Sequence, residues 1–283
     1  MSGENVLKVL DLCSGIGGFS LGLERAGMET VAFVEKDMAA QKVLRKHWPH
    51  VPIFNDLTTF NRKDVGEVDL ICGGFPCQPF STASHGVKVA VDLWPEMARV
   101  IKQFMPKYVI AENVSDKAIT AAKTDLERLG YTCETRNIKA AQCGADHNRS
   151  RWWLIAHTDN KGELSCSIDA EVAKLPELCS GLWGPENYAG TVRVPDGVSN
   201  RMDRLKQLGN AVLPQIPEVL GKALINVKQY KTIDFTRDKI TLRADSKGVG
   251  EITFIGGLPM VVTKVEQTPD SEVLRVLEAV TAK

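Results

Sequence analysis

The sequence predicts an α/β protein whose core is a doubly wound mixed sheet, and two observations support this. Short apolar runs alternate with amphipathic helical patterns along the first 157 residues. This alternation is typical of sheets whose strands are joined by helical crossovers. The residues best suited to chemistry follow directly after the apolar runs. In such sheets, ligands bind at the carboxyl ends of the strands.

The elements follow in a regular order. Strands are expected at 6–12, 31–35, 51–55, 68–72 and 108–113, with two closing strands at 131–138 and 151–156. Helices are expected at 18–27, 38–47, 94–104 and 117–129. A glycine ends the first helix and follows the last one, as it does at many helix C-termini.

Beyond the sheet the pattern changes twice. Residues 158–195 show no clear periodicity and are expected to be rich in loops. Order returns at Q-L-G-N-A-V, residues 207–212, and in a helical pattern over 214–225. From 229 to 283 apolar and polar residues alternate, which predicts a small β-rich appendage with a turn at Gly256–Gly257 and a final helix.

Composition narrows the class of protein. Lys and Arg total 35, as do Asp and Glu, so net charge alone does not indicate a polyanionic partner. The seven cysteines include no C-x-x-C pair, which argues against a disulfide framework and a metal site. No apolar run approaches the length of a membrane helix, and no secretory signal is apparent, so we expect a cytoplasmic protein.

A glycine-rich turn, D-L-C-S-G-I-G-G-F-S at 11–20, joins the first strand to the first helix. Such turns let the backbone approach a ligand, although this one lacks the last glycine of the dinucleotide-binding pattern. Glu35 and Asp56 follow the next two strands, where carboxylates suit ribose hydroxyls and an adenine amino group. Each acid alone is more simply read as a helix cap or a loop charge.

A cysteine stands between two prolines in G-G-F-P-C-Q-P-F-S, residues 73–81. Cys77 follows a strand directly, as nucleophiles often do, whereas Cys72 lies within the apolar run and is expected in the core. Glu112, in E-N-V, ends the next strand and should face the same crevice. Arg149 and Arg151 should project the same way if their segment is extended.

With these motifs in this order, the chain resembles the DNA (cytosine-5) methyltransferases over residues 7 to about 225. The resemblance implies the Rossmann-like fold of S-adenosylmethionine-dependent methyltransferases. Residues 1–157 would form the catalytic and cofactor-binding domain, 158–195 a compact target-recognition region, and 196–228 a return to the catalytic domain. The role of 229–283 lies outside the resemblance.

The resemblance also implies roles for single residues. Cys77 would attack carbon 6 of a cytosine flipped out of double-stranded DNA, while Glu112 and Arg151 hold the base. Arg149 would support Arg151, and Asn113 would brace the loop that carries Cys77. The implied contacts to S-adenosylmethionine are Asp11, Ser14, Gly15, Gly17, Gly18, Phe19, Glu35, Asp56, Pro76, Asn210 and Val212. Members of this family usually act as monomers, and we expect the same here.

Departures from the family pattern keep alternatives open. Asp146 and His147 replace the usual Pro-Gln, and Cys13 stands where Phe is frequent. The leading hypothesis is a modification enzyme that protects DNA from a restriction nuclease. A transfer-RNA cytosine methyltransferase is a second reading, disfavoured because its characteristic Cys-Phe-Thr is absent. A catalytically silent DNA-binding homologue is a third. The recognition sequence itself cannot be read from the chain.

Overall fold

The computed structural model describes residues 6–76, 92–144, 149–158, 163–180 and 210–226, and the backbone of five further strands between 231 and 281. The chain divides into two compact units, Met1–Ala223 and Leu224–Lys283. Each is described by itself below.

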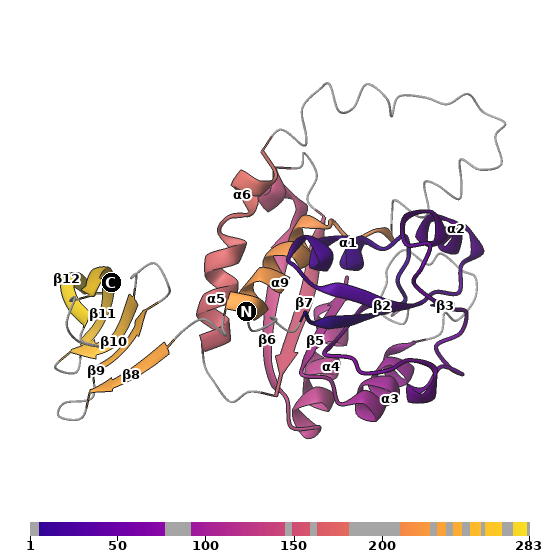
Figure 1. Cartoon of the computed structure of the whole chain (residues 1–283), viewed down its shortest axis with the longest axis horizontal. Coiled ribbons are helices and arrows are strands. Elements are labelled where there is room, and N and C mark those ends of the chain that lie inside the picture. The colour runs from indigo at the N-terminus through magenta and orange to yellow at the C-terminus, as the bar shows by residue number, and fades with distance from the viewer. Residues whose placement is uncertain are drawn as a thin grey trace. The chain divides into compact units, whose positions relative to one another are not determined.

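A seven-stranded mixed sheet forms the centre of the first unit, in the order β3-β2-β1-β4-β5-β7-β6 (Figure 1). Strands β1 to β5 run parallel, and β7 is antiparallel to both of its neighbours. The predicted α/β mixed sheet is confirmed. The bounds are β1 Lys8–Leu12, β2 Glu29–Val34, β3 Ile53–Phe54, β4 Leu70–Gly74, β5 Tyr108–Asn113, β6 Thr132–Lys139 and β7 Ser150–His157.

Helices cover both faces of this sheet (Figure 1). The first two, α1 and α2, connect strands that proceed from β1 toward one edge, and α3 and α4 connect strands that proceed from β4 toward the other. Right-handed crossovers therefore place the two pairs on opposite faces, with the chain changing direction between β1 and β4. The bounds are α1 Gly18–Arg25, α2 Met38–His47, α3 Trp94–Phe104 and α4 Asp116–Arg128. None of the described helices is long and apolar enough to cross a membrane.

The helices form where the sequence places caps and apolar stripes. The Asp37 carboxylate accepts a hydrogen bond from the Ala39 N–H at 2.8 Å and begins α2. Ser115 caps α4 in the same way. Along α3 the buried residues recur at helical spacing and pack against the sheet in the main hydrophobic cluster. They are Trp94, Met97, Val100, Ile101 and Phe104.

Residues 163–178 correct the expectation of a loop-rich segment, because they form α5 Glu163–Val172 and α6 Leu175–Leu178. The inward positions of α5 are Leu164, Ser167, Ile168 and Glu171, all buried. They have helical spacing, but two of the four are polar, so the apolar periodicity is hidden. The Ser167 hydroxyl donates to the Ala223 carbonyl at 3.0 Å, which explains why a polar side chain is buried there.

The segment after residue 210 contains the predicted helix, α9 Gln215–Asn226. A separate five-stranded antiparallel sheet follows, in the order β12-β11-β10-β9-β8. Its final strand corrects the expectation of a terminal helix, because 274–281 pairs with β11 along its length. Pairing with a distant partner decides this conformation. The bounds are β8 Lys231–Phe235, β9 Ile240–Ala244, β10 Gly250–Ile255, β11 Leu258–Gln267 and β12 Leu274–Thr281.

Two short 3₁₀ helices, η1 Arg62–Asp64 and η3 Ala140–Cys143, lie in connections of the first unit. Helix α1 packs closely against the start of α9. A Cβ atom added at Gly22 would lie 2.9 Å from the Glu218 backbone nitrogen and would also press on the Pro214 carbonyl. Gly221 makes the reciprocal approach to Ala26. The segment that leads into α9 is therefore held directly against α1.

Replacing Gly22 with Ala should destabilise the protein, although alanine favours helices. The new methyl group meets backbone atoms that cannot rotate away, so we expect the free energy of unfolding to fall by about 1–3 kcal/mol. Urea denaturation measures this. Gly66 has nothing within 4 Å of an added Cβ, so Gly66→Ala should leave stability unchanged or slightly raised. Equal effects of the two substitutions would contradict the packing described.

Candidate active site

The candidate site lies at the carboxyl ends of β1 and β4, where the chain changes direction within the sheet. Crevices at such switch points are the usual ligand sites of open α/β sheets. The turn after β1 contains the predicted glycines, and β4 ends at Gly74, two residues before Pro76. Cys77 itself lies outside the described residues, as do Asp146 and His147.

Glu112 is the last residue but one of β5 and forms an ion pair with Arg151, whose Nε lies 2.8 Å from Oε1. Glu112 is directly opposite Trp153 in the antiparallel pairing of β5 with β7, and Arg151 lies two residues before Trp153. All three residues line one small cavity. The structure therefore brings together Glu112 and Arg151, two of the side chains predicted to hold the base.

Burial sets the electrostatics of Glu112. Removing the carboxylate from water raises its pKa from 4.5 to about 6, and the positive charges of Arg151 and Arg149 partly oppose this rise. Only 13% of the side chain is exposed. A carboxyl group with this pKa can exist in both protonation states near neutral pH, which suits a group that shares a proton with a ligand.

Asn113 connects Glu112 to the loop that follows β4. Its side-chain Nδ2 donates to the Phe75 carbonyl at 2.8 Å, and its Oδ1 accepts from the Ser115 N–H at 3.0 Å. The residue is buried, so both bonds are protected from water. Asn113 thus fixes the backbone just before Pro76. Phe75 lies two residues before Cys77 in the sequence.

Arg149 contacts the segment that contains Asn210 and Val212. Its Nη2 donates to the Ala211 carbonyl at 2.9 Å, and Val212 and Arg149 line the same cavity as Glu112. A Cβ at Gly18 would lie 2.6 Å from the Val212 carbonyl. Two motifs almost 200 residues apart in the sequence therefore meet across the crevice.

The glycine-rich turn is tight, and its acidic residue faces inward. Gly15 and Gly17 have φ of 54° and 86°, and Cys13 shares this left-handed conformation at 52°, which is unusual for a residue with a side chain. Asp11 is fully buried, and its Oδ2 accepts from the Ser20 hydroxyl at 2.8 Å. Burial raises the pKa of Asp11 to about 7.

Ser14 and Phe19 complete the turn as supporting residues. The Ser14 hydroxyl donates to the Asp11 carbonyl at 2.7 Å, which closes the turn on itself. Phe19 is buried and its ring lies 5.4 Å from that of Trp153, centre to centre. The turn is thereby tied to the wall of the cavity that contains Glu112.

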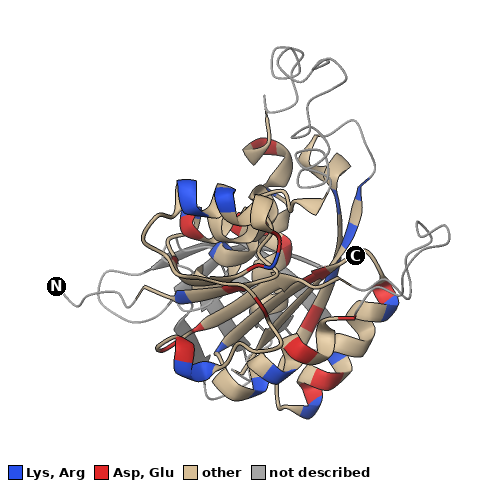
Figure 2. Cartoon of the chain, turned by 90° about the vertical axis from the view of Figure 1, so that its right-hand side faces the viewer, with Lys and Arg blue, Asp and Glu red and all other residues tan. Residues whose placement is uncertain are grey.

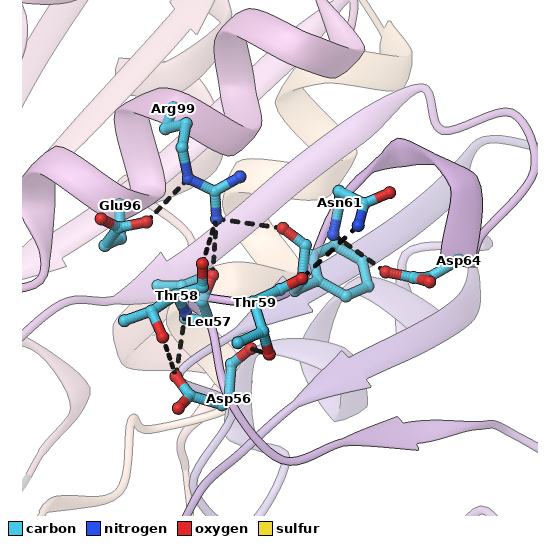
Figure 3. Close-up of polar contacts among 9 residues, drawn as sticks. Asp56, Leu57, Thr58, Thr59, Asn61, Asp64, Glu96 and Arg99 are labelled. Carbon is cyan, nitrogen blue, oxygen red and sulfur yellow. Dashed lines mark hydrogen bonds and ion pairs between the residues drawn. The ribbon is translucent and has the colours of Figure 1, made fainter.

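Glu35 and Asp56 lie after β2 and β3, on the side of the turn away from Glu112. The Glu35 carboxylate accepts the N–H groups of Gly15 at 2.6 Å and Asp37 at 2.7 Å. Asp56 lines a second, open cleft together with Phe54, Thr59 and Phe60. Its Oδ1 accepts from the Thr58 N–H and hydroxyl (Figure 3). These bonds lower its pKa.

The predicted residues thus fall into two groups, one around Glu112 and one around Glu35 and Asp56. The sequence reading missed several residues that line the Glu112 cavity: Ile138, Ala140, Trp153, Leu213 and Ile216. Trp153 was detectable, because it lies two residues after Arg151 and so faces the same side of β7. The others come from elements whose placement depends on the tertiary fold.

Comparison with known proteins identifies the class to which this fold and site belong. The sequence profile of the C-5 cytosine-specific DNA methylases matches residues 7–181, more than half of the chain. The chain belongs to this family.

Individual relatives share this part of the chain. The type II methyltransferase M.CviJI of Paramecium bursaria Chlorella virus IL3A is 34% identical over 160 residues, 53% of this chain and 42% of that protein. M.PspPI of Psychrobacter sp. (strain TA137) is 32% identical over 228 residues, 74% of this chain and 53% of that protein. The chain spans about half the length of the curated relatives it matches.

Among solved structures, the Entamoeba histolytica methyltransferase EhMeth aligns with a TM-score of 0.52. The alignment covers 80% of this chain and 99% of that one, at 14% sequence identity. At this identity the likeness concerns the fold alone, and it agrees with the mixed sheet described above.

The raised pKa of Glu112 predicts a pH-dependent effect of Glu112→Gln. Between pH 4.5 and about 6 the folded protein binds more protons here than the unfolded chain, so this residue's contribution to stability falls as pH rises. A neutral glutamine avoids that loss. Above pH 7 we expect the variant to be more stable than the parent by about 2 kcal/mol, with no difference near pH 4.

Urea denaturation between pH 4 and 8 measures this difference. Asp56→Asn is the control: because the pKa of Asp56 is lowered from 3.8, the effect of its charge is already complete above about pH 4, and the stability difference of this variant should be nearly constant across the range. A Glu112→Gln difference that is constant across this range would show that burial does not raise the pKa of the carboxyl group.

Proposed function

We propose that this chain transfers a methyl group from S-adenosylmethionine to carbon 5 of cytosine in double-stranded DNA. The observation that carries the proposal is the partly buried Glu112–Arg151 ion pair beside a loop that Asn113 holds in place. Family membership supports the reaction class. The matched relatives are type II methyltransferases, which supports a role in restriction-modification.

The residues of the first group suit a flipped-out cytosine. A carboxyl group with a pKa of about 6 can hold ring nitrogen 3 and the exocyclic amine, and can donate a proton where negative charge develops. Arg151 offers further N–H donors for the carbonyl at position 2 of the base.

Cys77 is proposed as the nucleophile. Its thiolate would add to carbon 6 of the base, which makes carbon 5 nucleophilic while Glu112 stabilises the charge on the ring. The cofactor, when bound, supplies the methyl group that carbon 5 takes up. A base then removes the proton from carbon 5, and elimination releases Cys77. The hydrogen bond from Asn113 to the Phe75 carbonyl holds the backbone two residues before Cys77.

The second group of residues fits the adenosyl part of that cofactor. Gly15 has open space where a Cβ would lie, so the backbone of the turn is accessible to a ligand. Each Glu35 oxygen accepts only one backbone N–H in the described structure and retains capacity for a ribose hydroxyl. Asp56, in its open cleft, suits an amino donor. Two further proposed contacts, Asn210 and Val212, belong to the segment that packs against the turn at Gly18.

The proposal that the substrate is DNA rests on the residues of the site and not on the surface charge. Acidic and basic residues are interspersed over the helices in the view of Figure 2, in keeping with the neutral total. Within 158–195, helix α5 is hydrogen-bonded to other parts of the first unit. Its Ser167 hydroxyl donates to the Ala223 carbonyl, and Arg136 of β6 donates to its Ser165 hydroxyl. We assign base recognition to the compact region 158–195, and we expect the chain to act as a monomer.

Transfer of labelled methyl groups from the cofactor tests the function. The chain should label double-stranded DNA containing cytosine and should not label transfer RNA. Labelling of transfer RNA alone would replace the proposed substrate. Labelling of neither, with the cofactor bound, would indicate a silent homologue.

Replacing Cys77 with Ser should abolish methyl transfer while binding of the cofactor persists, because serine is a far weaker nucleophile here. The parent should also form a stable covalent complex with DNA containing 5-fluorocytosine, since fluorine cannot be eliminated as the proton is, and the variant should not. Denaturing gel electrophoresis detects the complex. Cys72→Ser is the matched control: Cys72 is fully buried, so this change should lower stability and leave complex formation intact. A covalent complex in Cys77→Ser would disprove the assignment.

A further inference from the structure

Arg99, on α3, makes an unusual set of contacts with the loop that contains Asp56 (Figure 3). Its Nη2 donates to the carbonyl oxygens of Leu57 at 2.7 Å and Phe60 at 3.0 Å, with a longer contact to Thr58 at 3.4 Å. Its Nε is bonded to Glu96 Oε2 at 2.7 Å. One guanidinium thus holds successive peptide groups of the loop, and Glu96 fixes its orientation.

The peptide between Leu57 and Thr58 connects Arg99 to Asp56. The carbonyl of this peptide accepts from Arg99, and the N–H of the same peptide donates to Asp56 Oδ1 at 2.9 Å. The two groups of a trans peptide are fixed in one plane and point in opposite directions. Holding the carbonyl therefore orients the N–H that holds the Asp56 carboxylate.

Attachment of the loop does not require Arg99. Leu57 and Phe60 are buried in the main hydrophobic cluster, and the Phe60 ring stacks on that of Phe104, 6.2 Å away. These contacts secure the loop to α3. The bonds from Arg99 additionally orient the loop backbone next to the cleft that Asp56, Thr59 and Phe60 line.

We propose that Arg99 is a positioning residue for adenine recognition: it fixes the Leu57–Thr58 peptide and thereby aims the Asp56 carboxylate at the exocyclic amine of the adenine ring. This inference rests on the proposed function, in which Asp56 contacts the adenosyl group. It assigns Arg99 a role in cofactor selectivity without direct contact with the cofactor.

Arg99→Met keeps the aliphatic part of the side chain and removes its donors. We expect this variant to bind S-adenosylhomocysteine about tenfold more weakly, the usual effect of losing one charge-assisted hydrogen bond. The preference for S-adenosylhomocysteine over S-inosylhomocysteine, which lacks the amino group, should fall by a similar factor. Isothermal titration calorimetry on the full chain measures both. The rate of methyl transfer at saturating cofactor should be unchanged.

Arg62→Met is the matched control. Arg62 lies in η1, on the connection after β3, and its Nη1 donates to the Gln103 carbonyl of α3 at 3.2 Å. It therefore also links this connection to α3, but it does not contact the peptide that holds Asp56. It should leave the preference for the adenosyl ligand intact. A loss of preference equal to that of Arg99→Met would reduce the role of Arg99 to general support of the loop and overturn the proposal.

A double-mutant cycle tests whether Arg99 acts through Asp56. In the Asp56→Asn background, Arg99→Met should weaken binding no further, whereas an additive loss would overturn the proposal. Arg99→Lys, which keeps the charge, provides a folded variant if the methionine variant unfolds. It should also lose preference, because a single Nζ cannot occupy both the position of Nε, which bonds Glu96, and the position of Nη2, which bonds the loop carbonyls. Retained preference would count against the role. A parent chain that bound neither nucleoside would instead overturn the proposed cofactor.

Discussion

The antiparallel placement of β7 is the constraint on which the proposed catalytic group depends. Because β7 runs against β5, the start of β7 lies beside the carboxyl end of β5. Arg149 and Arg151, at the start of β7, are thereby brought to Glu112 at the end of β5. If β7 ran parallel to β5, its last residues would lie beside the carboxyl end of β5. The arginines at its start would then lie near the amino end of β5, away from Glu112.

Close backbone approaches then complete the crevice around that pair. The Val212 carbonyl occupies the space that a side chain at Gly18 would fill, and Pro214 and Glu218 pack against Gly22 in the same way. The bond from Arg149 to Ala211 holds the other side of this segment. Gly18 and Gly22 of α1, together with Arg149, therefore position the segment that begins at Asn210. These contacts explain how a motif late in the sequence reaches the glycine-rich turn after β1.

Most of the sheet could be predicted from the sequence, because its strands are short apolar runs separated by helices with clear stripes. The predicted α3, residues 94–104, agrees with the structure at both ends. By contrast, α5 was missed because Ser167 and Glu171 occupy two of its buried positions. The strand at 274–281 was mistaken for a helix because its conformation depends on pairing with β11, a contact that local sequence does not encode.

The candidate site was predictable to a similar degree. Residues at strand ends, such as Glu112 and Asp56, can be placed on the crevice from strand order alone. Positioning residues are harder, because their partners are backbone groups. Neither the bond from Asn113 to Phe75 nor the bonds from Arg99 to the Asp56 loop have a spacing signature in the sequence. For Asn113 the family resemblance supplied the expectation, and for Arg99 only the structure reveals the contact.

The position of Arg151 relative to Glu112 also decides which protonation state the site offers to a base. Burial alone favours the neutral carboxylic acid, and the adjacent guanidinium favours the carboxylate. Burial is the larger effect, so the pKa is raised, but the guanidinium groups of Arg151 and Arg149 limit the rise to about 6. A ligand that draws the guanidinium of Arg151 toward its own carbonyl would weaken the opposing effect and raise the pKa of Glu112 further. Binding of a cytosine by both side chains would therefore favour protonation of Glu112, the state that donates to ring nitrogen 3 as negative charge develops there.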